Sequence, residues 1–349
     1  MAIIPNSCKF HVVSSTVDTV DRGSAGFQSE RKIFTMADIT ETVDVTVSPY
    51  IVGESNSILP VIPTGVNVNT ITGGSCCSVI SGGDTNCING TYRATIGGGG
   101  VNLISLSGSA TIAGGTSHCI SVASGATIGG GFDHTVSASH STIAGGRTST
   151  SGSACGFIGG GLTHCMSGGA FATIAGGCEH EIASSGKANT IAGGLVHRIC
   201  GGEYGFIGGG SSNKICASAG NYNALVSGLS NDIESSSAEY SVISGGALND
   251  LTSYASVIAG GLFNDATGCQ SVVGGGNGNT ASATNSGILG GNGNTASCTT
   301  SFIVGNGITT DRVCSTFVNN LSIKNIPTAA TGLPSGSVWN NSGVLNIVT

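Results

Sequence analysis

The sequence predicts an all-β chain whose main part is a β-solenoid of about 14 coils, each 15–18 residues long. Three observations predict this fold. Glycine accounts for 60 of the 349 residues, an apolar anchor recurs along the chain, and a polar residue follows each anchor at a constant distance. Collagen is excluded because glycine does not occupy every third position and only 6 prolines are present.

The composition limits the possible partners. Charged residues make up only 8% of the chain and hydrophobic residues 39%, a balance opposite to that of disordered proteins. With 11 basic and 18 acidic residues, the net charge is −7, so the chain lacks the excess of basic residues expected of a nucleic-acid-binding protein. No apolar run is long enough for membrane insertion. The N-terminus lacks the pattern of a secretory signal, so we expect synthesis in a reducing compartment.

The repeat is defined by two aligned columns. The apolar anchors are Ile80, Ile96, Ile112, Ile128, Ile143, Ile158, Ile174, Ile191, Ile207, Leu225, Ile243, Ile258, Val273, Ile288 and Ile303. Six residues after an anchor comes a polar residue, Asn or His in every coil but the one with Ser149: Asn86, Asn102, His118, His134, His164, His180, His197, Asn213, Asn231, Asn249, Asn264, Asn279 and Asn294. A third, largely apolar column lies two residues further on.

This period suits two short strands joined by tight turns, because it is too short for a pair of helices. β-branched residues before many anchors favour strands, and the glycine pairs after the anchors favour corners. Side chains alternate between the two faces of a strand. The Asn/His column therefore shares its face with the apolar column that follows it, and we expect both to point inward as a ladder along the axis.

The chain divides into three expected parts. Residues 1–70 lack the repeat and would form an N-terminal attachment domain, residues 71–307 form the solenoid, and residues 308–349 form a C-terminal cap. Within the cap, the stretch from Ile326 to Thr349 predicts a short hairpin with Trp339 as its one large anchor.

The repeats TIAGGxxHxI, VISGGxxNDL and VVGGGNGNTA resemble the head repeats of YadA-like trimeric adhesins, over about residues 80–307. The resemblance implies a left-handed β-roll in which three chains pack side by side as a homotrimer. The C-terminal stretch that begins IPTAATGLPSGSVW is similar to terminal segments of phage and viral fibre proteins. The low charge of the repeat also predicts apolar surfaces for such packing.

Two features of the coils leave alternatives open. The histidines of the polar column would form a hydrogen-bonded ladder, or bind a metal at a three-fold axis; we expect the ladder, no metal and no cofactor. Stacked inward, these histidines should have a pKa below 6.5. Cys200 and Cys216 lie in adjacent coils within disulfide range, and we expect free thiols.

The sequence matches motifs of specific biochemical functions only poorly. The glycine runs lack the Lys-Ser/Thr of a phosphate loop, and the GGGNGNT stretch lacks the aspartates and nine-residue spacing of a calcium repeat. Glu179 and Glu181 form the one close glutamate pair, which we interpret as a solvated edge rather than an acid–base pair. Threonine before the anchors would suit an ice-binding face, but Phe157 and Phe206 interrupt the row. We therefore expect no enzyme.

A row of tyrosines is the candidate binding site. Tyr204, Tyr222 and Tyr240 each lie three residues before an anchor, and Tyr254 lies four before the next. Such a row would contact a glycan or a protein, or pack against a neighbouring chain.

These observations predict a non-enzymatic structural fibre or spike at the surface of a virus or phage particle. The N-terminal region would bind particle or capsid proteins, and the fibre would contact a host surface glycan or protein. The alternatives are a trimeric adhesin on a cell surface or a polysaccharide-cleaving tailspike.

Overall fold

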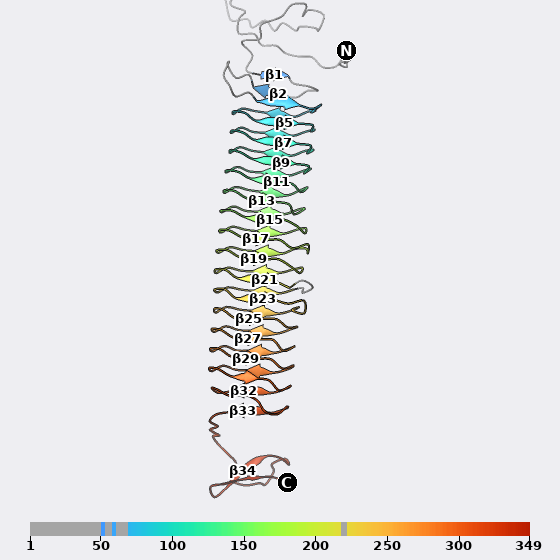
Figure 1. Ribbon diagram of the computed structural model, residues 1–349. Coiled ribbons are helices and arrows are strands. Elements are labelled where there is room, and N and C mark those ends of the chain that lie inside the picture. Colours follow the sequence, from blue (N-terminus) through green and yellow to red (C-terminus); the bar gives the residue numbers. More distant parts are fainter. Residues whose placement is uncertain (1–49, 53–57, 61–68, 218–221) are drawn as a thin grey trace, which may run out of the picture.

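The computed structural model describes residues 50–52, 58–60, 69–217 and 222–349. Within these ranges every regular element is a strand, and the chain winds into a parallel β-solenoid of about 15 turns (Figure 1). The predicted fold class is confirmed. The expected attachment domain, residues 1–70, lies almost entirely outside the described residues.

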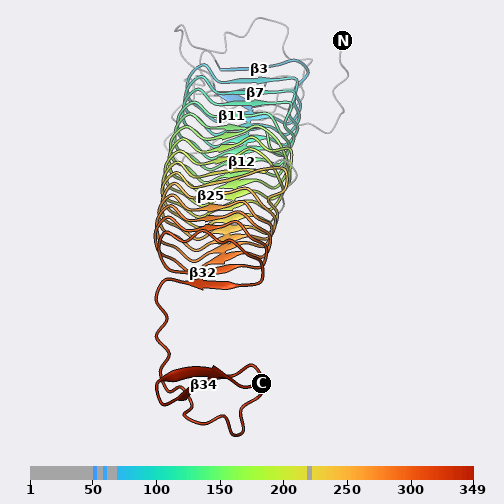
Figure 2. The same ribbon diagram turned by 60° about the horizontal axis from the view of Figure 1, so that its bottom comes forward.

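The repeating turns contribute one strand each to two stacks, called here sheet A and sheet B, in which neighbouring strands are parallel except for β1 and β2. Sheet A contains β1 (Tyr50–Val52), β2 (Ile58–Pro60), β4 (Val79–Ile80), β6 (Thr95–Ile96), β8 (Thr111–Ile112), β10 (Thr127–Ile128), β12 (Thr142–Ile143), β14 (Phe157–Ile158), β16 (Thr173–Ile174), β18 (Thr190–Ile191), β20 (Phe206–Ile207), β22 (Ala224–Leu225), β24 (Val242–Ile243), β26 (Val257–Ile258), β28 (Val272–Val273), β30 (Gly287–Ile288), β32 (Phe302–Val304) and β33 (Thr316–Val318). Sheet B contains β3 (Thr70–Thr72), β5 (Cys87–Asn89), β7 (Leu103–Ser105), β9 (Cys119–Ser121), β11 (Thr135–Val136), β13 (Thr150–Ser151), β15 (Cys165–Met166), β17 (Glu181–Ile182), β19 (Arg198–Ile199), β21 (Lys214–Cys216), β23 (Asp232–Glu234), β25 (Asp250–Leu251), β27 (Asp265–Ala266), β29 (Thr280–Ala281) and β31 (Thr295–Ala296). Figure 2 shows the flattened coils stacked on one another.

The core is a pair of apolar columns inside the coils. The parallel register sets Ile96 directly opposite Ile80 and Ile112 in sheet A, and Ile104 opposite Ile88 and Ile120 in sheet B. The anchors from Ile80 to Ile303 are essentially unexposed, as are the apolar residues of sheet B that face them. One coil buries little by itself, so stability comes from the stacking of neighbouring coils.

Two kinds of corner turn the chain. At Gly99, φ is +87°, and a Cβ there would overlap the carbonyl oxygen of Gly115 in the next coil. Only glycine fits such a position. The second kind uses residues with side chains, such as Val101 with φ of 59° and Tyr204 with φ of 57°. The expectation of glycine corners therefore holds for only part of the turns.

The solenoid ends differently from the predicted boundaries. Strand β1 pairs antiparallel with β2, which pairs parallel with β4, so the stack extends to residues before 71. At the other end β33 pairs parallel with β32, so sheet A continues past Gly307. The predicted C-terminal hairpin is present as β34 (Val338–Asn341, labelled in Figure 1) and β35 (Val344–Ile347). Trp339 is half-buried.

Candidate functional site

The asparagines of the polar column form an internal ladder that is continuous from Asn213 to Asn294. The side chain of Asn249 accepts a hydrogen bond through Oδ1 from the backbone N–H of Asn264, at 3.0 Å. Its Nδ2 donates to the carbonyl oxygens of Gly245 and Gly261, at 3.1 and 3.2 Å. Asn249 is 1% exposed. Each asparagine thus ties its own glycine corner to that of the next coil, and the same pattern recurs from Asn213 to Asn294.

The histidines occupy the same ladder positions, but they accept the backbone N–H of the next coil through Nδ1 instead of an amide oxygen. Nδ1 of His118 accepts the backbone N–H of His134 at 3.2 Å, and Nδ1 of His180 accepts that of His197 at 3.1 Å. A backbone N–H can only donate, so each Nδ1 must be unprotonated and the ring neutral, with its proton on Nε2. The rings stack face to face: His118 on His134 at 5.0 Å, and His164 on His180 at 5.1 Å between centroids.

The surroundings disfavour protonated histidine. Burial, followed by the charge of the neighbouring imidazole, lowers the pKa of His118 and of His180 to about 4. Burial also lowers the pKa of His134, His164 and His197, against a smaller upward effect of hydrogen bonding to the backbone. The predicted direction is confirmed. Because Nδ1 is already engaged by the backbone, a metal would have only the buried Nε2 to bind.

The ladder begins one coil before the predicted column, and it is broken at Ser149, the one member of the column that is neither Asn nor His. Asn69 already accepts the backbone N–H of Asn86 through Oδ1 at 2.9 Å, so the ladder begins one coil earlier. The hydroxyl of Ser149 is buried without a hydrogen-bond partner among the described residues. Serine is too short to reach the next coil, and it divides the histidines into the pair His118–His134 and the triplet His164–His180–His197.

Removing one ladder side chain should destabilise its coil. Asn249→Ala leaves the buried N–H of Asn264 without an acceptor, and we expect the free energy of unfolding of that region to fall by about 2–3 kcal/mol. Hydrogen exchange of the amides around Asn264 measures the loss. The matched control is Asn277→Ala, because Asn277 is exposed and donates to Asn292 at the surface. Equal protection in both variants would contradict a stabilising ladder.

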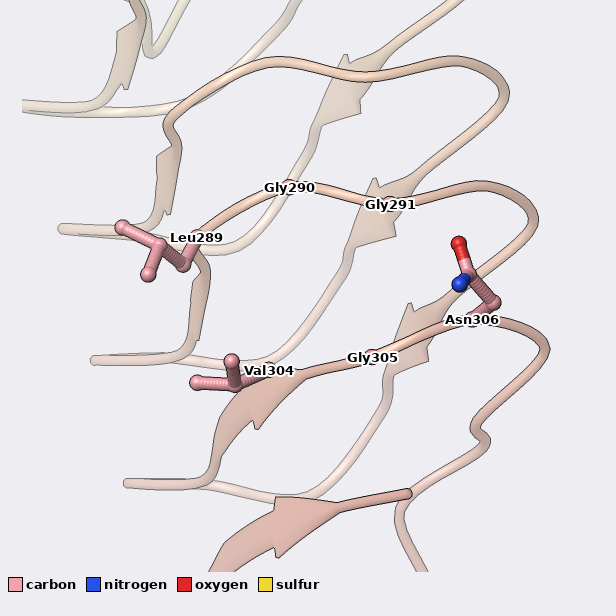
Figure 3. A pocket seen from close by; sticks show the side chains of 6 residues that line it. All are labelled: Leu289, Gly290, Gly291, Val304, Gly305 and Asn306. Carbon is pink, nitrogen blue, oxygen red and sulfur yellow. The ribbon is translucent and has the colours of Figure 1, made fainter. Parts of the chain in front are cut away.

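The outer face of sheet A carries no ionisable side chain from Val79 to Val304. Threonine, valine and phenylalanine point outward just before the anchors, and glycine, alanine and a few larger aliphatic residues follow them. Phe157 and Val272 are 42% and 45% exposed on this face. Near its end this face has a depression of about 290 Å³. Figure 3 shows Leu289 and Val304 projecting there, beside the glycines that also line it.

An apolar ridge runs along the corner beside this face. Parallel bridges stack the residues four positions after the anchors, and in alternate coils these are large and apolar. The apolar ridge consists of Phe132, Leu162, Leu195, Leu229 and Leu262, which are 39–51% exposed. The coils between them contribute Arg147, Cys178, Ser211 and Ala247. Arg147 lies over the ring of Phe132 at 5.7 Å. This alternation repeats every two coils.

The outer face of sheet B differs, because its coils from Glu181 to Asp265 carry charged side chains. Glu181 pairs with Arg198 at 2.9 Å, and Lys214 pairs with Asp232 and Glu234. Asp232 stacks on Asp250, and burial raises the pKa of Asp232 to about 6. Glu181 is thus part of a surface ion pair, in agreement with the interpretation of a solvated edge. Such exposed pairs contribute little stability, about 0–1 kcal/mol each.

The structure brings the four predicted tyrosines together. Tyr204 stacks on Tyr222 at 4.8 Å and Tyr222 on Tyr240 at 5.3 Å between centroids, with the rings nearly parallel. Tyr254 meets Tyr240 edge-on at 5.9 Å. All four side chains are 41–52% exposed. The tyrosine column therefore lies along an edge of the coils, available for contact.

The prediction that Cys200 and Cys216 are free thiols is wrong. They are joined by a disulfide across adjacent coils, with Cα atoms 4.8 Å apart, whereas free thiols were predicted. The parallel register places Ile199 opposite Ile215, which sets the next residues within the distance that a disulfide spans. Ten further cysteines of the described ranges are free thiols.

Among the described residues, no group of three or more His, Cys, Asp and Glu side chains is placed to hold a metal ion. In the same part of the chain no helix is long and apolar enough to cross a membrane. In the comparisons with known proteins, no family model and no curated protein matches this chain.

Proposed function

We propose that this protein is a non-enzymatic structural fibre or spike of a virus or phage particle, and that it works as a side-by-side homotrimer. The N-terminal region attaches it to particle proteins, and the solenoid projects from the virion and contacts the host surface. The observation that carries the proposal is the contrast between the two long faces. Sheet A is uncharged along its whole outer face, while the outer face of sheet B carries ion pairs and stacked carboxylates in its coils from Glu181 to Asp265.

This contrast is what a self-associating rod requires. Large contiguous uncharged surfaces on a soluble chain mark interfaces, whereas a charged face suits contact with water. The apolar ridge and the exposed phenylalanines of sheet A would meet the same residues of neighbouring chains. About 15 turns at about 4.8 Å each give a rod of about 70 Å, long enough to project from a particle.

The assembly is tested by light scattering and electron microscopy of the full chain. We expect a mass about three times 34.1 kDa and rods with a shaft about 70 Å long. A stable monomer of the full chain would contradict the trimer while leaving the solenoid intact.

The location is tested by mass spectrometry of purified virions, in which we expect this chain in stoichiometric amount. Recovery in a cell-surface fraction in the absence of any particle would favour the adhesin of the same architecture. Release of new reducing ends from host glycans would favour the tailspike.

A further inference from the structure

Within the tyrosine column, stacking covers most of the ring faces, because each ring packs on the next. Tyr222 has Tyr204 on one side and Tyr240 on the other, at 4.8 and 5.3 Å between centroids, and the planes differ by only 2° and 6°. Tyr254 packs against Tyr240 in a T-shaped contact at 5.9 Å between centroids. A ligand that packs on a ring face therefore has access to Tyr204, on the side of the preceding coil.

The preceding coil has no ring at this corner. Ala188 occupies the position of the tyrosines, and Phe171 occupies it one coil earlier. All three backbones have the same left-handed conformation, with φ of 59° at Phe171, 56° at Ala188 and 57° at Tyr204. Hydrogen bonds from Ala188 to Ala170 and from Tyr204 to Lys187, both 2.9 Å, keep the corners in register. The aromatic column thus lacks one member between Phe171 and Tyr204.

The spacing suits one six-membered ring. Two coils separate Phe171 from Tyr204, which places their side chains about 10 Å apart along the axis. Rings pack with centroids about 4.5–7 Å apart, so a ring midway would contact both. Phe171 is 58% exposed and makes no ring contact in the described part of the chain. A ring in that place would have Phe171 on one side and Tyr204 on the other.

Charged groups border this position. Lys187 and Glu203 directly precede Ala188 and Tyr204, and Lys187 is exposed. The Cγ atom of Glu203 lies 3.0 Å from where a Cβ of Gly186 would stand, so this side chain reaches over the coil of Ala188. An ammonium donates and a carboxylate accepts hydrogen bonds. A pyranose has C–H groups on its two faces and hydroxyl groups around its edge. Its faces would pack on the aromatic rings, and its hydroxyl groups would form hydrogen bonds with the bordering charged side chains.

We propose that Phe171 and Tyr204 sandwich one pyranose unit of a glycan in the place that Ala188 leaves open. The choice of a surface glycan rests on the host contact in the proposed function, whereas the site itself stands on the geometry of this one edge. The tyrosines beyond Tyr204 then support the wall by stacking and do not contact the sugar.

Ala188→Tyr is the decisive variant, because it completes the aromatic column. Tyrosine already occupies this left-handed corner at Tyr204, Tyr222 and Tyr240, so the fold tolerates it. Saturation-transfer NMR of the full chain with methyl β-D-glucopyranoside should show transfer to the ring C–H protons. We expect this signal to fall about fivefold or more in Ala188→Tyr and in Phe171→Ala. The matched control is Ala255→Tyr, at an equivalent corner with φ of 51°, which should bind as the unchanged chain does.

Several outcomes would overturn the assignment. Full saturation transfer in both Ala188→Tyr and Phe171→Ala would place the sugar elsewhere, and no transfer with the unchanged chain would mean that the gap does not bind it. Transfer to p-cresol without transfer to the glucoside would mean that the gap receives an aromatic side chain of a partner protein. Light scattering of the same samples separates the two proposals, because a monomer that still binds the glucoside keeps the site and contradicts only the trimer.

Discussion

Lowering the pH from 7.5 to 5 should loosen the coils from Ile112 to Ile207 and leave the asparagine coils after Leu225 closed. The first segment contains all five ladder histidines, and its neutral imidazoles accept backbone N–H groups through Nδ1. Protonation places a donor against a donor at each of these bonds, and it also sets cations about 5 Å apart within each stack. We therefore expect acid to act on the ladder itself.

The sign follows from the two pKa values. His118 and His180 have a pKa of about 4 when folded, against 6.5 when unfolded, so the unfolded chain binds protons more readily between these values. The stabilising contribution is complete above pH 6.5 and declines as the pH falls toward 4. At pH 5 a large part of it is lost, and the loss adds over five histidines.

The carboxylates of sheet B oppose this effect in the other segment. Burial raises the pKa of Asp232 to about 6 and also raises that of Asp250 and Asp265. A carboxylic acid whose folded pKa is raised favours the folded state more as the pH falls through that value. The coils from Leu225 to Val273 should therefore hold or gain stability at pH 5, which sharpens the contrast between the two segments.

Hydrogen exchange resolved by coil, corrected for the intrinsic effect of pH, measures the contrast. The variant His118→Asn/His134→Asn uses the residue that the chain itself places in the ladder, and it should remove the acid effect from its own coils. His140→Asn is the control, because His140 is exposed and lies outside the ladder. An unchanged ratio of protection between the two segments at both pH values would show that the ladder histidines do not respond to acid.

The interior of this fold could be predicted from the sequence because it depends on alternation. Once Ile112 is an inward anchor, the strand geometry determines that His118 and Ile120 share a face, and burial of both agrees. The tyrosine column followed from position in the repeat in the same way. The repeat length also required parallel stacking, since each coil must pair with the next.

The corners and the outer faces could not be predicted in this way. At Val101 and Tyr204 the sequence has no glycine that would predict the left-handed backbone conformation. This conformation arises because the hydrogen bonds between stacked coils impose the same turn on every coil. The break at Ser149 depends on the reach of one side chain. The apolar ridge has a period of two coils, so it becomes visible only after the bridges show which residues are neighbours. The gap in the aromatic column at Ala188 can likewise be recognised only when it is known which corner residues are neighbours.

Replacing two residues of the apolar ridge by charge, in Leu195→Glu/Leu229→Glu, should convert the proposed trimer into monomers. Leu195 and Leu229 lie two coils apart at the centre of the ridge and are 46% and 51% exposed in the single chain. In the trimer these positions would be buried, and two carboxylates from each chain would lose water and face one another. The single chain should still fold, because the same column holds Asp84 and Arg147.

The control must add the same charge to an equally apolar surface elsewhere. Leu106→Glu/Val122→Glu does this, since both residues are 65–69% exposed and lie at the far end of sheet B strands. We expect light scattering to give about 34.1 kDa for the ridge variant and about three times that mass for the control, with equal β content by circular dichroism. A trimeric ridge variant would move the interface away from this edge. A monomeric control beside a trimeric ridge variant would assign the interface to the side of sheet B near Leu106 and Val122.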